Sequence, residues 1–157
     1  MVEAKIVNAK ARKLIGISQK MSLKHNSTTE LWRTFGPHLS TIRHQKSKER
    51  ISLQIYPKNY FKHFNPNLEF EKWAAVEVSE FSEPKANLNC LSIPAGLHAV
   101  FQYQGLSGDP SIFQYIYGEW IAQSDYELDE RPHFEILGPN YRNNDPLSEE
   151  EIWIPIK

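Results

Sequence analysis

A short tryptophan-containing strand pattern occurs twice in this chain and constrains the fold more than any other feature. Residues 71–76 read Glu-Lys-Trp-Ala-Ala-Val, and residues 151–156 read Glu-Ile-Trp-Ile-Pro-Ile. Upstream of each copy the pattern predicts the same elements, namely a short strand, a helix and a glycine-containing strand. We therefore predict a duplication, with pseudo-repeats at about 10–80 and 88–157, and a cleft where the two halves meet.

The composition is that of a folded domain without disulfides. Hydrophobic residues make up 40% of the 157 residues and aromatic residues 12%, which is enough for a buried core. No apolar run approaches the roughly 20 residues of a membrane-spanning helix, and the N-terminus lacks the apolar segment of a signal peptide. Cys90 is the single cysteine, which excludes an intramolecular disulfide and predicts a cytoplasmic location.

The charge is unevenly distributed along the chain. Residues 1–50 hold 11 Lys and Arg against 3 Asp and Glu, whereas residues 51–157 hold 7 against 16. A basic segment can contact nucleic acid, but no recognition helix, zinc-finger spacing or RNA-binding aromatic motif accompanies this one. We therefore expect a solvated basic surface that balances the acidic half, with no direct binding of nucleic acid.

The first repeat is predicted to contain a helix among three strands. Ser27 and Glu30 have the spacing of a capping box, and an apolar stripe with helical spacing follows them. Gly36 and Pro37 interrupt this stripe, so the continuity of the helix is left open. The predicted strands are residues 13–18, 51–56 and 73–78.

The second repeat has the same predicted order. Asp109 and Pro110 form a helix start, with a capping side chain followed by proline at the first helical position. The predicted strands are residues 91–101, which Pro94 to Gly96 could divide in two, 133–137 and 151–156. Together the repeats predict an α+β fold of duplicated β-α-β-β units, with antiparallel sheets, helices on one face and a cleft between the halves.

Alternation along the predicted strands assigns their side chains to two faces. In the last strand Ile152 and Ile154 are expected to pack on the helices, which turns Trp153 to the opposite face. The same argument sends further residues toward the helices, namely Leu53, Ile55, Val76, Val78, Phe134 and Ile136. The opposite face would then combine aromatic and acidic side chains, which are Gln54, Tyr56, Trp73, Glu77, Glu135 and Trp153.

Glu135 is the candidate ligand-binding residue of that face. Burying a carboxylate between apolar residues costs free energy unless a counter-charge pairs with it, a proton neutralises it or it has a functional role. Among aromatic rings an ionised Glu135 would suit an organic cation, with each cation–π contact worth about 0.5–2 kcal/mol. An exposed Glu135, or one paired with Arg131, is left open, and so is whether the helical Tyr117 and Trp120 reach the cleft or belong to the core.

Five short segments have the order and spacing of a known family. They are Ile-Pro-Ala-Gly (93–96), Phe-Gln-Tyr-Gln-Gly (101–105), Trp-Ile-Ala-Gln-Ser-Asp-Tyr (120–126), Phe-Glu (134–135) and Ile-Pro-Ile-Lys (154–157). In them the chain resembles the GyrI-like, or AraC-type effector-binding, small-molecule domain over nearly its whole length. The resemblance implies a single domain over residues 1–157, ligands bound between the halves, and Glu135 as the acid that receives cationic or hydrophobic ligands in an aromatic pocket.

The resemblance implies a free-standing bacterial protein that binds a lipophilic or cationic effector, as the effector domains of multidrug-responsive transcription regulators do. The predicted ligand-binding residues are Glu135, Trp153, Trp73, Tyr56, Tyr117 and Trp120. Two alternatives stay open: a hydrolase of reactive xenobiotics with Glu135 as general base, and a protein inhibitor of DNA gyrase. No cofactor or metal is expected, because the six histidines lack metal-ligand spacing. A protein partner or a homodimer is left open.

Overall fold

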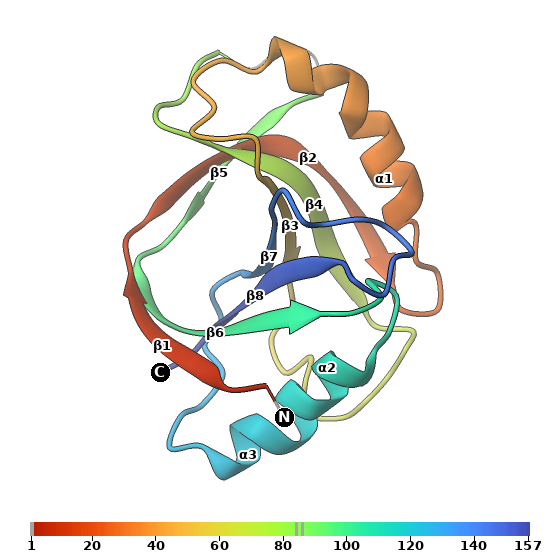
Figure 1. The fold of residues 1–157 in the computed structure, drawn as a ribbon, viewed down its shortest axis with the longest axis vertical. Helices are drawn as coiled ribbons and strands as arrows, with labels where there is room; N and C mark the ends of the chain where they lie inside the picture. The colour runs from red at the N-terminus through yellow and green to blue at the C-terminus, as the bar shows by residue number, and fades with distance from the viewer. Residues whose placement is uncertain (1, 84, 86) are drawn as a thin grey trace.

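Eight antiparallel strands form one sheet within the part of the chain that the computed structural model describes, residues 2–83, 85 and 87–157 (Figure 1). The strands are β1 (Ala4–Ala9), β2 (Arg12–Ser22), β3 (Arg50–Ile55), β4 (Glu69–Val78), β5 (Asn89–Ile93), β6 (Gly96–Gln104), β7 (His133–Leu137) and β8 (Glu149–Pro155). Their order across the sheet is β1-β6-β8-β7-β3-β4-β2-β5. The central pair is therefore β7 and β3, and the edges are β1 and β5.

The strand order is symmetric about the central pair, and the register of the two halves matches. Leu53 of β3 pairs with Trp73 of β4, and Phe134 of β7 pairs with Trp153 of β8. The edge strands cross between the halves, because β1 pairs with β6 and β5 pairs with β2. The predicted α+β fold with antiparallel pairing is confirmed, and the two Glu-x-Trp segments take equivalent places in it.

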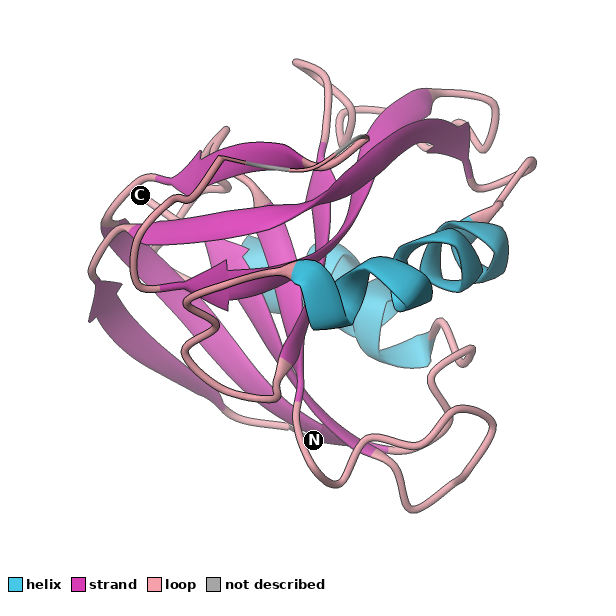
Figure 2. Ribbon diagram, turned by 90° about the horizontal axis from the view of Figure 1, so that it is seen from above, coloured by secondary structure: helices cyan, strands magenta, loops and turns pink. Residues whose placement is uncertain are grey.

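The helices lie on one face of the sheet, here called the helical face (Figure 2). α1 (Thr28–Phe35) ends at the predicted interruption and continues as a 3₁₀ turn, η1 (Gly36–Thr41), because Pro37 lacks the N–H that an α-helix would use. A second helix consists of α2 (Ser111–Tyr115), the π-helical turn η2 (Ile116–Trp120) and α3 (Ile121–Gln123).

Both predicted helix caps are shifted by one residue. Asp109 accepts a hydrogen bond from the Ser111 N–H through its Oδ1 at 2.9 Å, but the helix begins at Ser111, so Pro110 and not Asp109 is the N-cap residue. The predicted capping box is wrong, because Ser27 makes no side-chain cap bond. Asn26 instead accepts the Thr28 N–H at 2.9 Å through its Oδ1. An Asx side chain one residue earlier thus begins α1.

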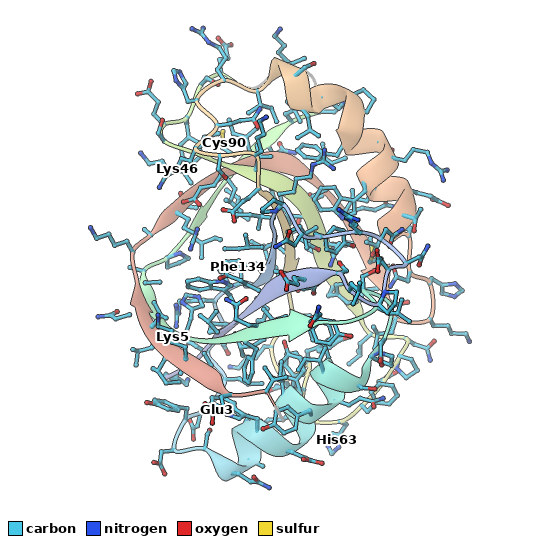
Figure 3. The ribbon with its side chains drawn as sticks, in the orientation of Figure 1. Glu3, Lys5, Lys46, His63, Cys90 and Phe134 are labelled. Atoms are coloured by element: carbon cyan, nitrogen blue, oxygen red, sulfur yellow. The ribbon has the colours of Figure 1, made fainter. Side chains whose placement is uncertain are left out.

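Apolar side chains fill both faces of the sheet. On the helical face one cluster lies under α1, with β2 and β4, and a second lies under α2, with β6 and β8. The opposite face, here called the inner face, is enclosed because the sheet curls and both edge strands pack on the same cluster. That cluster contains Leu14, Ile51, Leu53, Trp73, Ala75, Ile93, Val100, Phe134, Ile136 and Trp153. Figure 3 shows Phe134 within the curve of the strands.

The predicted faces are right for two strands and wrong for two. Val76 of β4 and Ile152 of β8 pack on the helical side, as predicted. In the central strands β3 and β7 the prediction is reversed, since Leu53 and Phe134 belong to the inner cluster. Both faces of the sheet are enclosed, so apolar side chains occur on both. Alternation alone therefore does not show which set of residues faces the helices.

Arg12 and His98 are two of the polar residues that contact the aromatic rings of the inner face, and Glu151 is a third, since its Oε1 accepts a hydrogen bond from the Trp153 Nε1–H at 3.2 Å. The Arg12 guanidinium lies 4.8 Å from the Trp153 ring centroid and 2.6 Å from Glu77, so Glu77 is ion-paired rather than an isolated exposed residue. His98 contacts Trp153 and Phe134 at centroid distances of 5.5 and 5.6 Å. Burial lowers the pKa of His98 to about 4, and the nearby Arg131 adds to the effect. His98 is therefore neutral at physiological pH.

Candidate functional site

A buried polar strip runs along the middle of the helical face. Every buried side chain that β3 and β7 direct to this face is polar: Ser52 and Gln54 from β3, and His133 and Glu135 from β7. The strip separates the apolar cluster under α1 from the one under α2. Burying polar groups between two apolar clusters costs stability unless they are satisfied, so this strip is the candidate site.

Glu135 is buried beside an amide and a lysine. The Gln54 Nε2 donates a hydrogen bond to its Oε1 at 3.2 Å, and the residue is only 8% exposed. Burial raises the pKa of Glu135, while the Lys72 ammonium and the Gln54 bond act in the opposite direction. Both alternatives that the sequence left open are wrong, because Glu135 is not exposed and Arg131 pairs with Asp129 at 2.6 Å.

Glu150 is a second carboxyl group of the site that the sequence analysis missed. It lies on β8 two residues before Ile152, which pairs with Glu135 across β7 and β8. Burial raises the pKa of Glu150 to about 7, the Glu135 charge adds to the rise, and Lys72 opposes it. Lys72 is buried, and burial lowers its pKa against the pull of both carboxylates. The site thus contains two acids and one base.

Aromatic rings line the outer side of these charges. Residues 56–68, here called the 56–68 loop, connect β3 to β4 and bring Tyr56, Tyr60 and Phe61 over the strip. Tyr56 lies 4.9 Å from His133 between ring centroids, and Phe61 lies 4.4 Å from Tyr117. The space that the sequence predicts as a cleft between the halves is therefore filled by side chains of the chain itself.

The aromatic residues next to Glu135 are neutral. Burial raises the pKa of Tyr56 and of Tyr117 well above the usual range, and the Glu135 charge raises both further. Burial lowers the pKa of His133 to about 3. The Tyr117 hydroxyl hydrogen-bonds His133 Nδ1 at 2.7 Å, and Tyr117 lies in the π-helical turn η2, a feature frequent at functional sites. The charges of the site are thus confined to Glu135, Glu150 and Lys72.

The structure brings together some of the predicted site residues and separates others. Tyr56 and Tyr117 lie beside Glu135, on the helical face. Trp73 and Trp153 belong to the inner cluster, so the prediction that they share a face with Glu135 is wrong. Trp120 contacts Phe101, at 5.2 Å between ring centroids, in the apolar cluster under α2.

The site residues that the sequence analysis missed are Lys72, Glu150, Phe61 and His133. Alternation places His133 on the same face as Glu135 whichever way β7 is turned, so the signal for His133 was present in the sequence. Lys72 and Glu150 could have been recognised because each is a charged residue that shares the helix-facing side of its strand with apolar residues. Phe61 comes from a loop without periodicity, and no pattern indicated it. We call Gln54, Tyr56, Lys72, Tyr117, His133, Glu135 and Glu150 the Glu135 cluster.

A hollow with a volume of about 700 Å³ lies elsewhere on the molecule. Its lining comes from the end of β2, the start of α1 and the residues before β4, and includes Lys20, Lys24, His25 and Asn67. Most of these side chains are exposed, and none belongs to the Glu135 cluster. We favour the Glu135 cluster as the site because its charges are buried, which surface side chains do not require.

The described residues contain neither a metal-binding cluster nor a membrane-spanning helix. No group of three or more His, Cys, Asp or Glu in residues 2–83, 85 and 87–157 is placed to hold a metal ion. Over the same residues, no helix has the length and apolarity needed to cross a membrane.

Comparison with known proteins identifies the family. The Pseudomonas aeruginosa transcriptional regulator BrlR is 28% identical over 159 residues, covering 99% of this chain and 56% of the regulator, so the chain spans about half of that relative. The fold matches the EcmrR C-terminal domain with a TM-score of 0.70 and 13% identity, over 100% of this chain and 98% of that one. It matches SAV2435, solved bound to tetraphenylphosphonium, with a TM-score of 0.65 and 17% identity, over 99% and 94%. The model of the GyrI-like small molecule binding domain matches residues 3–157, so this chain belongs to that family.

Proposed function

We propose that the Glu135 cluster binds a lipophilic organic cation with a single positive charge. The observation that supports this most directly is the composition of the cluster, two carboxyl groups against one buried lysine, Glu135 and Glu150 against Lys72. With both acids ionised the cluster has one negative charge in excess. A bound monocation would neutralise it away from water, where charge interactions are strong.

The aromatic wall fits the same class of ligand. The Glu135 charge acts on Tyr56 and Tyr117, and Tyr60 packs on Tyr56, so a cation beside Glu135 would lie among aromatic rings. A cation over a ring face gains about 0.5–2 kcal/mol per contact. A hydrated inorganic ion would gain little from such walls, whereas an organic cation can also bury its apolar surface there. SAV2435, a protein of the same fold, is known with the lipophilic cation tetraphenylphosphonium.

We further propose that the chain acts as an effector domain, with ligand binding as the signal. The regulator BrlR is longer than this chain, and the matched part covers 56% of it. In a regulator of this kind, the effector domain binds the ligand and another part of the protein contacts DNA.

The experiment is a calorimetric titration with tetraphenylphosphonium, using Glu135→Gln as the test variant and the neutral triphenylphosphine oxide as the control ligand. Removing one partner of a buried charge pair costs about 2–5 kcal/mol, so we expect the variant to bind at least about 30-fold more weakly. Glu119→Gln, an exposed change on the same helical face, is the matched control and should bind as the unmodified chain does.

Two results would overturn the proposal. One is equal affinity of Glu135→Gln and the unmodified chain for the cation, with the variant shown to be folded by its melting temperature. The other is equal affinity for the cation and for the neutral oxide. If the unmodified chain forms a product from a hydrolysable cationic ester and Glu135→Gln does not, the hydrolase alternative is favoured.

A further inference from the structure

The Phe61 ring occupies a slot lined by other rings of the site. It lies nearly parallel to the Tyr117 ring, at a centroid distance of 4.4 Å and an angle of 23°. It is also nearly parallel to the His133 ring, at 5.4 Å and 25°, and contacts Tyr56 edge to face at 4.8 Å. These three neighbours are members of the Glu135 cluster. Phe61 therefore covers the cluster from the side of the loop.

The 56–68 loop is tied to the segment after β2 at one end, where Pro66 accepts a hydrogen bond from the Lys24 N–H at 3.0 Å, but residues 57–65 are held less firmly. The backbone hydrogen bonds of residues 57–65 close turns within the loop, from Tyr60 to Pro57 at 3.1 Å and from Lys62 to Asn59 at 3.2 Å. The contacts that fasten this stretch to the rest of the molecule are mainly those of the Tyr60 and Phe61 rings. Phe61 is 37% exposed and Phe64 is 84% exposed, so the ring lies at the surface end of the site. Moving Phe61 outward breaks aromatic contacts but no strand pairing.

We infer that Phe61 occupies the place of a ligand's aromatic group, and that an aromatic cation binds by displacing this ring from its slot. The inference rests on the proposed function and adds a selectivity to it. The slot between Tyr117 and His133 fits a flat ring, so a cation with an aromatic substituent can replace the contacts that Phe61 gives up. A cation with only alkyl groups cannot replace them in the same geometry.

The test compares Phe61→Ala with Phe64→Ala, a change of the same residue type in the same loop. The probe is tetraphenylphosphonium, titrated by calorimetry. Stacked aromatic pairs are worth about 0.5–1.5 kcal/mol each, and Phe61→Ala removes two of them from the free protein. We therefore expect Phe61→Ala to bind the probe about tenfold more tightly than the unmodified chain, and Phe64→Ala to bind as the unmodified chain does.

A second measurement uses the unmodified chain. Lys58 and Lys62 flank Phe61 and are exposed. If the ring is displaced, the probe should speed tryptic cleavage at Lys58 and Lys62 several-fold, although a ligand that simply stabilised the fold would slow it.

The outcomes separate this inference from the proposed function. If the probe binds in a Glu135-dependent way, but Phe61→Ala binds it equally or more weakly, Phe61 does not compete with the ligand and the inference fails alone. Slower cleavage of the loop in the presence of the probe would likewise contradict the displacement of Phe61 without contradicting the proposed function. If neither the unmodified chain nor Phe61→Ala binds the probe, the proposed function fails and the inference fails with it.

Discussion

Replacing Glu150 by glutamine should change how the stability of this protein depends on pH. Burial raises the pKa of Glu150 from 4.5 to about 7 in the folded chain, and the Glu135 charge contributes to that rise. The folded state therefore holds this proton more tightly than the unfolded state. Between about pH 4.5 and about pH 7 the unfolded chain ionises at this residue while the folded protein keeps the proton, so the free energy of unfolding falls as pH rises through this range.

The size of the effect follows from the shift. A difference of about 2.5 pKa units corresponds to about 3 kcal/mol at 1.36 kcal/mol per unit, which is an upper limit. Glu150 is only half-buried, so solvent screening reduces this, and we expect about 1–2 kcal/mol. Glutamine has nearly the same shape and no charge. Relative to the unmodified protein, the free energy of unfolding of Glu150→Gln should therefore rise by about 1–2 kcal/mol between pH 5 and pH 8.

Urea unfolding followed by tryptophan fluorescence, at pH 5, 6, 7 and 8, measures this difference. Glu149→Gln is the matched control, because Glu149 is the exposed neighbour on the same strand. Glu135→Gln should lessen the pH dependence at Glu150, because it removes the second cause of the raised pKa. A constant difference between Glu150→Gln and the unmodified protein from pH 5 to 8 would refute the reasoning.

Two further predictions concern the inner face. Burial lowers the pKa of His98 to about 4, so below about pH 6.5 the unfolded chain binds a proton at this residue that the folded chain does not bind. The free energy of unfolding should therefore fall by about 1–2 kcal/mol toward pH 4. Thermal melts of His98→Phe should show a smaller loss over that range, and an identical loss would contradict the assignment. Arg12→Ala should lower the free energy of unfolding by about 1–2 kcal/mol, since it removes the 2.6 Å ion pair with Glu77 and the contact with Trp153. Arg12→Lys should recover little of this, because lysine lacks the planar group that stacks on a ring, and full recovery would show that charge alone matters.

The fold class was predictable because local patterns in this chain agree with its tertiary structure. The helix that begins after Asp109 and the strands around Trp73 and Trp153 have strong periodicity, and each forms where it is expected. β1 was not predicted as a strand. It is an edge strand in which Lys5, Ile6 and Asn8 are all exposed, so it lacks the regular alternation of apolar and polar residues that indicates a strand.

The site was only partly predictable, and the central strands show why. Residues 51–55 alternate cleanly, yet alternation gives only relative directions, and the usual assumption turns the apolar side toward the helices. Here Leu53 and Phe134 turn away from the helices because the curled sheet encloses a core of its own. Glu135 was selected as the candidate acid from its apolar neighbours in sequence and not from the direction of the face. The sequence left its burial open, and the structure shows that it is buried.

The crossing of the edge strands has a consequence for how the protein folds. β1 pairs with β6, with partners such as Ala4 and Phe101 nearly a hundred residues apart, and β5 pairs back with β2. Neither half can complete its sheet without a strand from the other, so we expect the halves to fold and unfold together in one cooperative transition. Pairings of such long separation close slowly, because the entropy of a long loop is lost before the contacts form. A protein of this design should fold slowly and should not be divisible into two stable fragments at residues 79–88.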